Sequence, residues 1–175
     1  MDLLERFELV EDMKCKIIVR TEVQGEVEVT KTKFAFKKPS KYRSEDEDII
    51  KVSNGETVWV CDKSSGEVRA GDLSEVTQPV FDFASMVQSK MEKSNKEYLG
   101  EDQIEGRDCF IARLTPLDTT EDVKSEQKIW VDREFWYPLR IEMIEEMSYM
   151  ALYYEDLEFN AGLSDDMFEL DVPQD

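Results

Sequence analysis

The chain has 175 residues, of which 41 are acidic and 22 basic, so its net charge is −19 at pH 7. This length suits a single domain, residues 1–175, and the hydrophobic fraction of 41% is that of a globular protein. A charge of −19 repels nucleic acid phosphates, which excludes nucleic acid as an expected partner and leaves solubility, adaptation to salt or a basic partner as interpretations.

The first third of the chain predicts one helix and then strands. An amphipathic helix is expected within residues 1–11, from apolar residues at helical spacing: Leu3, Leu4, Phe7 and Val10. Strands follow at 15–23 and 26–37, joined by a Gln24-Gly25 turn. In the second strand the apolar residues change parity between Val29 and Phe34, which predicts a bulge.

Four short strands and a helix are expected next. The strands are predicted at 41–45, 49–53, 57–62 and 67–70, and Asn54-Gly55 is a strong hairpin signal. The helix is predicted at 79–93, where Thr77 could cap it. Its apolar stripe comprises Val80, Phe83, Ala84, Val87 and Met91.

The remainder again predicts strands. These are expected at 97–104, 109–114, 127–132, 139–143 and 147–159, and the sheet is expected to hold about ten strands. The tail, 160–175, carries a turn at Gly162 and the apolar anchors Phe168 and Pro173.

Several of these strands are apolar on both faces, for example 57–61, 129–131 and 150–154. A sheet with one face in water would instead alternate apolar and polar residues. The pattern favours a strongly curved antiparallel sheet, with one face under helices and the other facing a hollow. The alternative is a two-layer α+β core without a cavity.

The side-chain inventory points away from catalysis. The chain has no histidine, which excludes the usual serine and cysteine triads and most zinc sites. Cys15, Cys61 and Cys109 form no C-x-x-C pair, so they are expected as buried small residues, with one disulfide as the alternative. The many carboxylates are expected on the solvated surface. No cofactor, metal or enzymatic activity is therefore predicted.

Four segments together resemble a known family. They are F-K-K-P-S-K-Y-R at 36–43, N-G-E-T-V-W-V-C-D at 54–62, W-V-D at 130–132 with P-L-R at 138–140, and N-A-G-L at 160–163 with Phe168 and Pro173. In order and spacing they are similar to the lipoprotein carrier superfamily of LolA and LolB, which includes envelope lipoproteins and RseB-like sigma-factor regulators. The resemblance covers most of the chain.

The resemblance implies a mainly β, α+β fold: an incomplete, half-open β-barrel of antiparallel strands, with residues 79–93 as a helical lid over an apolar cavity. The expected lipid-binding residues are Phe34, Phe36, Trp59, Trp130, Ile141 and Met143 as walls, with Phe83 and Val87 on the lid. Carriers proper have an arginine just before the proline, where this chain has Lys38. Lysine lacks the planar fork of arginine, so a gating role of Lys38 would use different hydrogen bonds.

The resulting hypothesis is a non-enzymatic envelope protein that binds an acyl chain of a lipid or a lipoprotein, including membrane-associated partners. The alternative is a protein-interaction or sensor module whose cavity is filled by side chains. The resemblance and the abrupt start of the chain together predict an extracytoplasmic protein made from a longer precursor, which could carry a lipoprotein anchor.

Overall fold

The computed structural model describes residues 9–72, 87, 89–117 and 126–170. Most of the predicted N-terminal helix, and Phe83 in the predicted lid, lie outside the described residues. Residues 87 and 89–92, which are helical, are called the interior helix below.

Eleven strands form a single sheet, in which neighbouring strands pair antiparallel from β2 to β6 and from β7 to β11. The mainly β prediction is therefore confirmed, with eleven strands where about ten were expected. The strands are β1 (Asp12–Val23), β2 (Glu26–Lys37), β3 (Lys41–Glu45), β4 (Ile49–Asn54), β5 (Thr57–Asp62), β6 (Val68–Asp72), β7 (Ser94–Ile104), β8 (Arg107–Pro116), β9 (Glu126–Asp132), β10 (Pro138–Glu145) and β11 (Ser148–Phe159).

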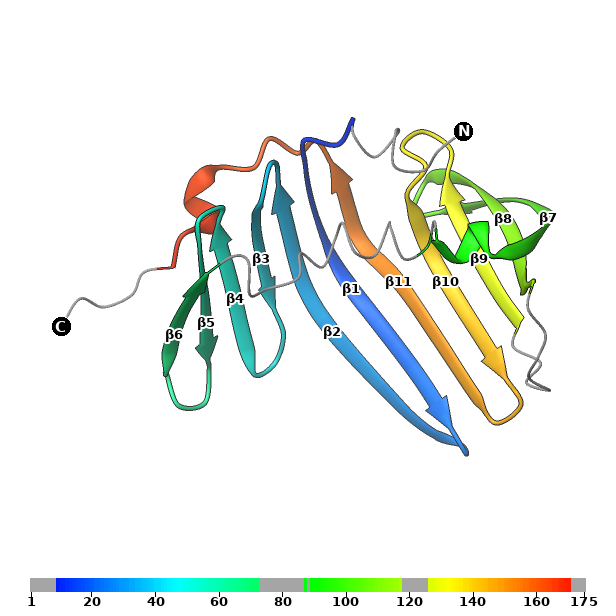
Figure 1. The fold of residues 1–175 in the computed structure, drawn as a ribbon, viewed down its shortest axis with the longest axis horizontal. Helices are drawn as coiled ribbons and strands as arrows, with labels where there is room; N and C mark the ends of the chain where they lie inside the picture. The colour runs from blue at the N-terminus through cyan, green and yellow to red at the C-terminus, as the bar shows by residue number, and fades with distance from the viewer. Residues whose placement is uncertain (1–8, 73–86, 88, 118–125, 171–175) are drawn as a thin grey trace. The chain divides into compact units, whose positions relative to one another are not determined.

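The strand order is β6-β5-β4-β3-β2-β1-β11-β10-β9-β8-β7 (Figure 1). Every pair of neighbouring strands is consecutive in sequence except β1 and β11, the pair that joins the early half of the chain to the late half, and the consecutive strands β6 and β7 form the two edges. Short turns therefore account for most pairings, whereas β1 and β11 are separated by more than a hundred residues.

The chain divides into two compact units. Unit 1 comprises Met1–Leu9, Ile18–Thr30 and Phe81–Glu155, and unit 2 comprises Val10–Ile17, Lys31–Val80 and Asp156–Asp175. The core of unit 1 is built from Val87 of the interior helix with Leu114, Ile129 and Val131 of β8 and β9. The core of unit 2 includes Ala35 of β2, Leu163, and Phe168 of a short 3₁₀ helix, Asp165–Phe168.

Candidate functional site

One face of the four strands β8 to β11 is almost wholly apolar. Residues that pair across antiparallel strands lie side by side on the same face. The pairings define one row across the sheet: Ala112, Ile129, Ile141 and Leu152. They also define the next row: Leu114, Gln127, Met143 and Met150. The two rows form a continuous apolar floor with one amide group in it.

The interior helix covers this floor and leaves a cavity of about 190 Å³. Val87 is buried and packs against Leu114 and Ile129, so the helix lies over β8 and β9 (Figure 1). The cavity is lined by Val87, Lys90, Leu114, Gln127, Lys128, Ile129, Ile141, Met143, Met150 and Leu152. We call it the apolar pocket.

The polar groups of the apolar pocket are few and of one sign. They are Lys90, Gln127 and Lys128, and no carboxylate belongs to the described lining. Lys128 alternates with Ile129 along β9, so its side chain points to the opposite face of the sheet and Lys90 is the cationic side chain that faces the pocket. Lys90 Nζ lies 3.6 Å from the sulfur of Met143, and Lys128 Nζ lies 3.5 Å from Glu126. Such a lining suits an apolar chain whose polar end is neutral or anionic, and it offers no acid, base or nucleophile pair for chemistry.

Three of the predicted binding residues meet at this pocket. Ile141 and Met143 lie in its floor, and Val87 lies in its roof.

Trp130 lies on the opposite face of the sheet, because it alternates with Ile129 along β9. Its indole N–H donates to Asp102 at 3.1 Å, and the guanidinium of Arg140 lies 5.2 Å from its ring. Trp130 therefore belongs to a polar and aromatic outer face and does not line the apolar pocket.

The predicted wall residues of unit 2 divide between two faces. Phe34 and Phe36 are buried on one face of β2. Trp59 lies on the other face. The strand pairings place Trp59 in one row with Val52 and Ala35, and Ala35 alternates with Phe34 and Phe36 along β2. These three aromatic residues do not line the apolar pocket, and a role for them in ligand binding stays a prediction.

Lys38 makes a long ion pair, 3.7 Å, with Glu11. Two lysines close to it in sequence make shorter ion pairs: Lys37 and Lys41 both pair with Asp165, at 2.7 and 2.9 Å. This basic segment thus holds the chain after Asn160 in unit 2, and a gating role for Lys38 remains a prediction.

The sequence analysis missed seven residues of the pocket: Lys90, Leu114, Gln127, Lys128, Ile129, Met150 and Leu152. Each sits in a strand or helix that the sequence predicted, and alternation alone puts Met150 and Leu152 on one face. What the sequence lacked was the register between strands, which decides that these residues lie opposite Met143 and Ile141.

The cysteines are buried or half-buried thiols. Burial raises the pKa of Cys15 to about 12, and burial is also the first cause of the raised pKa of Cys109. Among the described residues, no cluster of three acidic or cysteine side chains could hold a metal ion. No helix in the same part of the chain has the length and apolar composition needed to cross a membrane.

A family model that carries only the description of an uncharacterised protein matches residues 28–152, and the chain belongs to that family. The chain is also 30% identical over 174 residues to the uncharacterised protein MJ0687 of Methanocaldococcus jannaschii, an alignment that covers 97% of this chain and 49% of that protein. The chain therefore spans about half the length of the curated relative that it matches.

Solved structures show the same fold at low sequence identity. The lipoprotein LppX of Mycobacterium tuberculosis superposes with a TM-score of 0.51 at 14% identity, covering 93% of each chain. The MucA/MucB complex of Pseudomonas aeruginosa gives 0.50 at 13% identity, over 96% of this chain and 59% of that one. A LolA superfamily protein of Nitrosomonas europaea gives 0.45 at 12% identity, over 97% and 96%. The likeness to LppX and to MucB shows a shared fold, in agreement with the expected resemblance.

Proposed function

We propose that this chain is a non-enzymatic binding protein that holds part of an acyl chain, from a lipid or a lipidated protein, in the apolar pocket of unit 1. The observation that carries the proposal is the pocket itself, whose floor is two cross-strand rows of aliphatic and methionine side chains with one glutamine. Methionine adapts its shape to irregular apolar partners, and two of the eight floor positions are Met143 and Met150.

The size of the pocket limits what it can hold in this state. A volume of 190 Å³ is about six times the roughly 30 Å³ that a water molecule occupies in the liquid, and a methylene group is of similar bulk. Burial of about six methylenes at about 0.8 kcal/mol each would contribute about 5 kcal/mol. The free-energy cost of association is subtracted from this contribution, so an acyl chain would bind weakly to the pocket in this state. Tighter binding requires a larger cavity.

The interior helix is the element that could enlarge it, and we assign it the role of the predicted lid. Val87 and Lys90 are its contacts with the pocket, and the floor beneath belongs to paired strands. Displacing the helix breaks side-chain packing and leaves the strand hydrogen bonds intact, so it costs less than disturbing the sheet. A half-open barrel with this helix as its lid is the form in which the domain would receive a longer chain.

The proteins of similar fold support a proposal for the cellular location and the partner of this chain. One is named as a lipoprotein, one is a LolA superfamily protein, and a third is a complex of MucB with MucA. By analogy we place this chain in the cell envelope, outside the cytoplasmic membrane, with a lipoprotein or membrane-associated partner.

A second candidate function follows from the small volume. A pocket of 190 Å³ could also receive one apolar side chain of a protein partner, which would make the domain an interaction or sensor module. The two candidates differ in what co-purifies with the protein, a lipid or a polypeptide.

The test uses two charge substitutions on the same strand, β10. Ile141→Glu puts a carboxylate into the apolar pocket, and Ile144→Glu adds the same charge at an exposed position. We expect Ile141→Glu to weaken binding of a fluorescent fatty acid by more than about tenfold, because an unpaired buried carboxylate is costly and repels an anionic ligand. Ile144→Glu should bind within about twofold of the wild type, a difference of less than 0.5 kcal/mol.

A third variant covers the case in which Ile141→Glu fails to fold. Leu152→Trp fills the pocket without adding charge, and it should also abolish probe binding while the melting temperature shows that the fold is kept. If both folded pocket variants bind the fatty acid as the wild type does, the pocket is not the lipid site. Mass spectrometry of the purified wild type then distinguishes a bound lipid from a bound peptide.

A further inference from the structure

The polarity of the apolar pocket changes along its length. Alternate residues of a strand share a face, so the pocket face of β9 runs from the buried Val131 to Gln127, and that of β11 runs from the buried Tyr154 to Ser148. Met143 of β10 is the cross-strand partner of Gln127 and of Met150, so the polar residues of both strands lie at the same end. The pocket therefore has an apolar end and a polar end.

Lys90 of the interior helix lies at the polar end. Its Nζ is 3.6 Å from the sulfur of Met143, the residue opposite Gln127. A thioether sulfur is a weak hydrogen-bond acceptor, so it compensates little for the partial burial of an ammonium group. The ammonium of Lys90 and the amide of Gln127 thus bring hydrogen-bond donors to one end of an otherwise apolar cavity.

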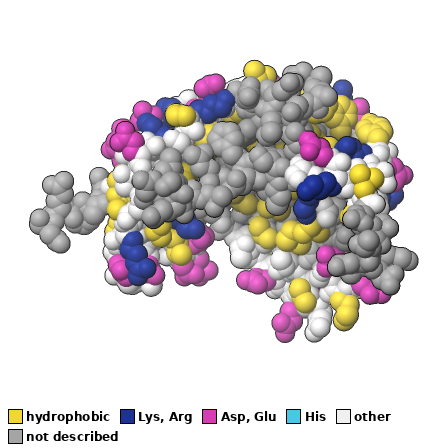
Figure 2. Space-filling view, viewed as in Figure 1, with side chains coloured by type: hydrophobic (Ala, Val, Ile, Leu, Met, Phe, Trp, Pro, Cys, Tyr) yellow, Lys and Arg dark blue, Asp and Glu magenta, His cyan; other side chains and the backbone are white. Residues whose placement is uncertain are grey.

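The contacts of Lys90 differ from those of the other half-buried lysines in the described part of the chain. The others each form an ion pair with a carboxylate, at 2.7 to 3.7 Å: Lys14, Lys37, Lys38, Lys41 and Lys128. Carboxylates are not scarce, since the chain has 41 acidic residues and Figure 2 shows acidic side chains spread over the face in view. Among the described residues, however, none of them pairs with Lys90, whose hydrogen-bond partner there is Met143. The cation is therefore available to an anion that enters the pocket.

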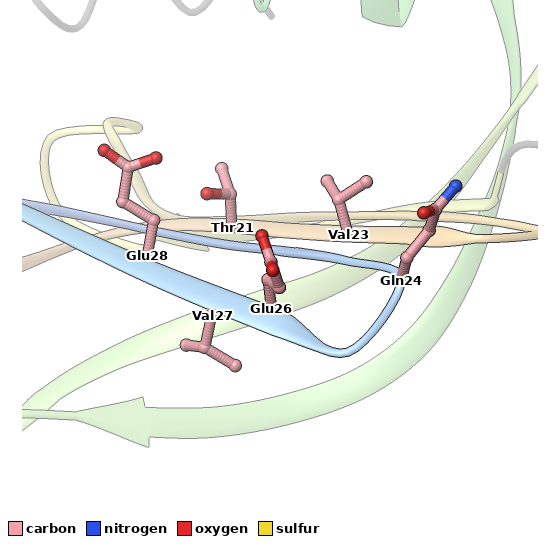
Figure 3. Close-up of a pocket in the computed structure, with 6 residues that line it drawn as sticks. All are labelled: Thr21, Val23, Gln24, Glu26, Val27 and Glu28. Atoms are coloured by element: carbon pink, nitrogen blue, oxygen red, sulfur yellow. The ribbon is translucent and has the colours of Figure 1, made fainter.

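A cavity at the tip of the β1–β2 hairpin has the opposite charge. Its volume is about 380 Å³, and its lining includes Glu26 and Glu28 but no lysine or arginine. Figure 3 shows that both carboxylates point to the same side of the hairpin as Val23. Two carboxylates repel an anion. Of these two cavities, the apolar pocket is thus the one that suits a ligand with a negative charge.

We propose that the ligand of the apolar pocket is an amphiphile whose single apolar chain ends in an anionic group, a carboxylate or a phosphate, that pairs with Lys90. This inference rests on the proposed function and deepens it, because it assigns the end group of the bound chain. The chain would run from Lys90 towards Val131, and the anion would accept hydrogen bonds from the ammonium and from the amide of Gln127. Such charge-assisted hydrogen bonds are stronger than neutral ones. A cationic end group is repelled by Lys90, and a neutral one leaves its ammonium without an ionic partner.

The experiment measures how well small amphiphiles displace a neutral naphthylamine dye from the wild-type protein at pH 7. Octanoate, octyl phosphate, methyl octanoate and octyltrimethylammonium have similar chains and differ in the charge of the end group. We expect both anions to bind about tenfold more tightly than methyl octanoate, and octyltrimethylammonium to bind most weakly. The tighter of the two anions identifies the end group. Acetate and inorganic phosphate should not displace the dye, because they lack the apolar chain.

Variants of the two donors locate the anionic group. Lys90→Met removes the charge and keeps a long apolar side chain, so the advantage of the anions over methyl octanoate should fall to within about twofold. Gln127→Glu is nearly isosteric and supplies a carboxylate for Lys90 from the protein itself, so it should also remove the preference. Lys90→Arg keeps the charge and should keep the preference. Melting temperatures show that each variant is folded.

The matched control is Lys93→Met, which removes the same charge from an exposed residue that does not line the apolar pocket. It should bind all four amphiphiles within about twofold of the wild type. If the anion preference survives in folded Lys90→Met, or if Lys93→Met loses it equally, the inference is wrong while the lipid site stands. If neither the dye nor any amphiphile binds the wild type, the proposed lipid site is wrong and the inference falls with it.

Discussion

Asp132 shows how much a single side chain does in this fold. It is 1% exposed, and its carboxylate accepts hydrogen bonds from the backbone N–H groups of Glu134 and Phe135 at 2.9 and 2.7 Å. Its other oxygen lies 2.6 Å from Nε of Arg107. One buried carboxylate therefore accepts hydrogen bonds from the backbone of the turn between β9 and β10 and pairs with a largely buried guanidinium. It lies directly beside the core of unit 1.

Replacing Asp132 with alanine should be strongly destabilising. The change removes the acceptor of two backbone N–H groups and the nearer carboxylate of Arg107, whose ion pair with Glu134 is longer, at 3.6 Å. We expect a loss of about 3 kcal/mol in the free energy of unfolding, measured by urea denaturation.

Asp62→Ala is the matched control for this prediction. Asp62 makes the corresponding turn after β5, where it accepts from the N–H groups of Ser64 and Ser65, but its side chain is exposed. The loss at Asp62 should be clearly smaller. Equal losses at the two positions would mean that the turn, and not the buried ion pair with Arg107, determines the stability.

The turns after β5 and β9 differ at their fifth residue, which is Gly66 in one and Trp136 in the other, and the sequence alone does not explain this difference. The fifth position has a positive φ in both, 72° at Gly66 and 56° at Trp136. Glycine adopts this conformation without strain, whereas a bulky side chain does so only when its packing compensates. Trp136 packs against the core cluster of Val87, Leu114, Ile129 and Val131, and this contact is the compensation.

At the scale of elements, the segment from Asn160 to Phe168 is held to unit 2 mainly by polar contacts. The carboxylate of Asp12 accepts the N–H groups of Gly162 and Leu163, and Nζ of Lys37 donates to the carbonyl oxygen of Leu163 at 2.7 Å. Asp165 then pairs with Lys37 and Lys41, while Phe168 is fully buried. The segment contributes two core side chains, Leu163 and Phe168, and polar contacts hold the remainder.

These charges predict an acid-sensitive segment. Hydrogen bonds from Lys37 and Lys41 lower the pKa of Asp165 from 3.8 to about 2. Because the folded-state pKa is the lower one, the stabilisation is fully present above pH 3.8 and is lost as the pH falls through about 2.

We therefore expect wild type to melt at a higher temperature than Asp165→Asn above pH 3.8, with the two melting temperatures converging near pH 2. Added salt should reduce the difference, because Asp165 is exposed and its ion pairs are screened. If the difference in melting temperature does not change with pH, then asparagine destabilises the segment for steric reasons and the ion pairs with Lys37 and Lys41 do not stabilise it.

Most strands could be predicted from the sequence because their signals are local. The predicted strands at 26–37, 41–45 and 57–62 have the bounds of β2, β3 and β5, and the others begin or end within a few residues of the prediction. Glycine turns and alternation of apolar residues are properties of chain neighbours. The irregularities between Tyr98 and Gly100 and between Pro138 and Arg140 were not predicted, although a glycine or a proline within a strand is typical of such positions.

At the scale of the whole molecule, the candidate site was predictable only in part. Ile141, Met143 and Val87 were selected as apolar residues of a strand pair and a helix, and they line the apolar pocket. Trp130 was selected for the same reason, yet its indole faces Asp102 and Arg140 on the other side of the sheet. Composition identifies an apolar residue, but the face it occupies depends on which neighbours cover that face.

The sequence by itself determined the antiparallel strands, the absence of histidine chemistry and a strongly negative surface, because each follows from residue types or from near neighbours along the chain. The tertiary structure alone decided that β1 lies beside β11, that Met143 lies opposite Gln127 and Met150, and that Gln24 meets Met147. The physical reason is that pairing between distant strands has no local signal. It is selected by the free energy of packing the whole sheet, in which a register shifted by one residue would turn every apolar side chain to the wrong face.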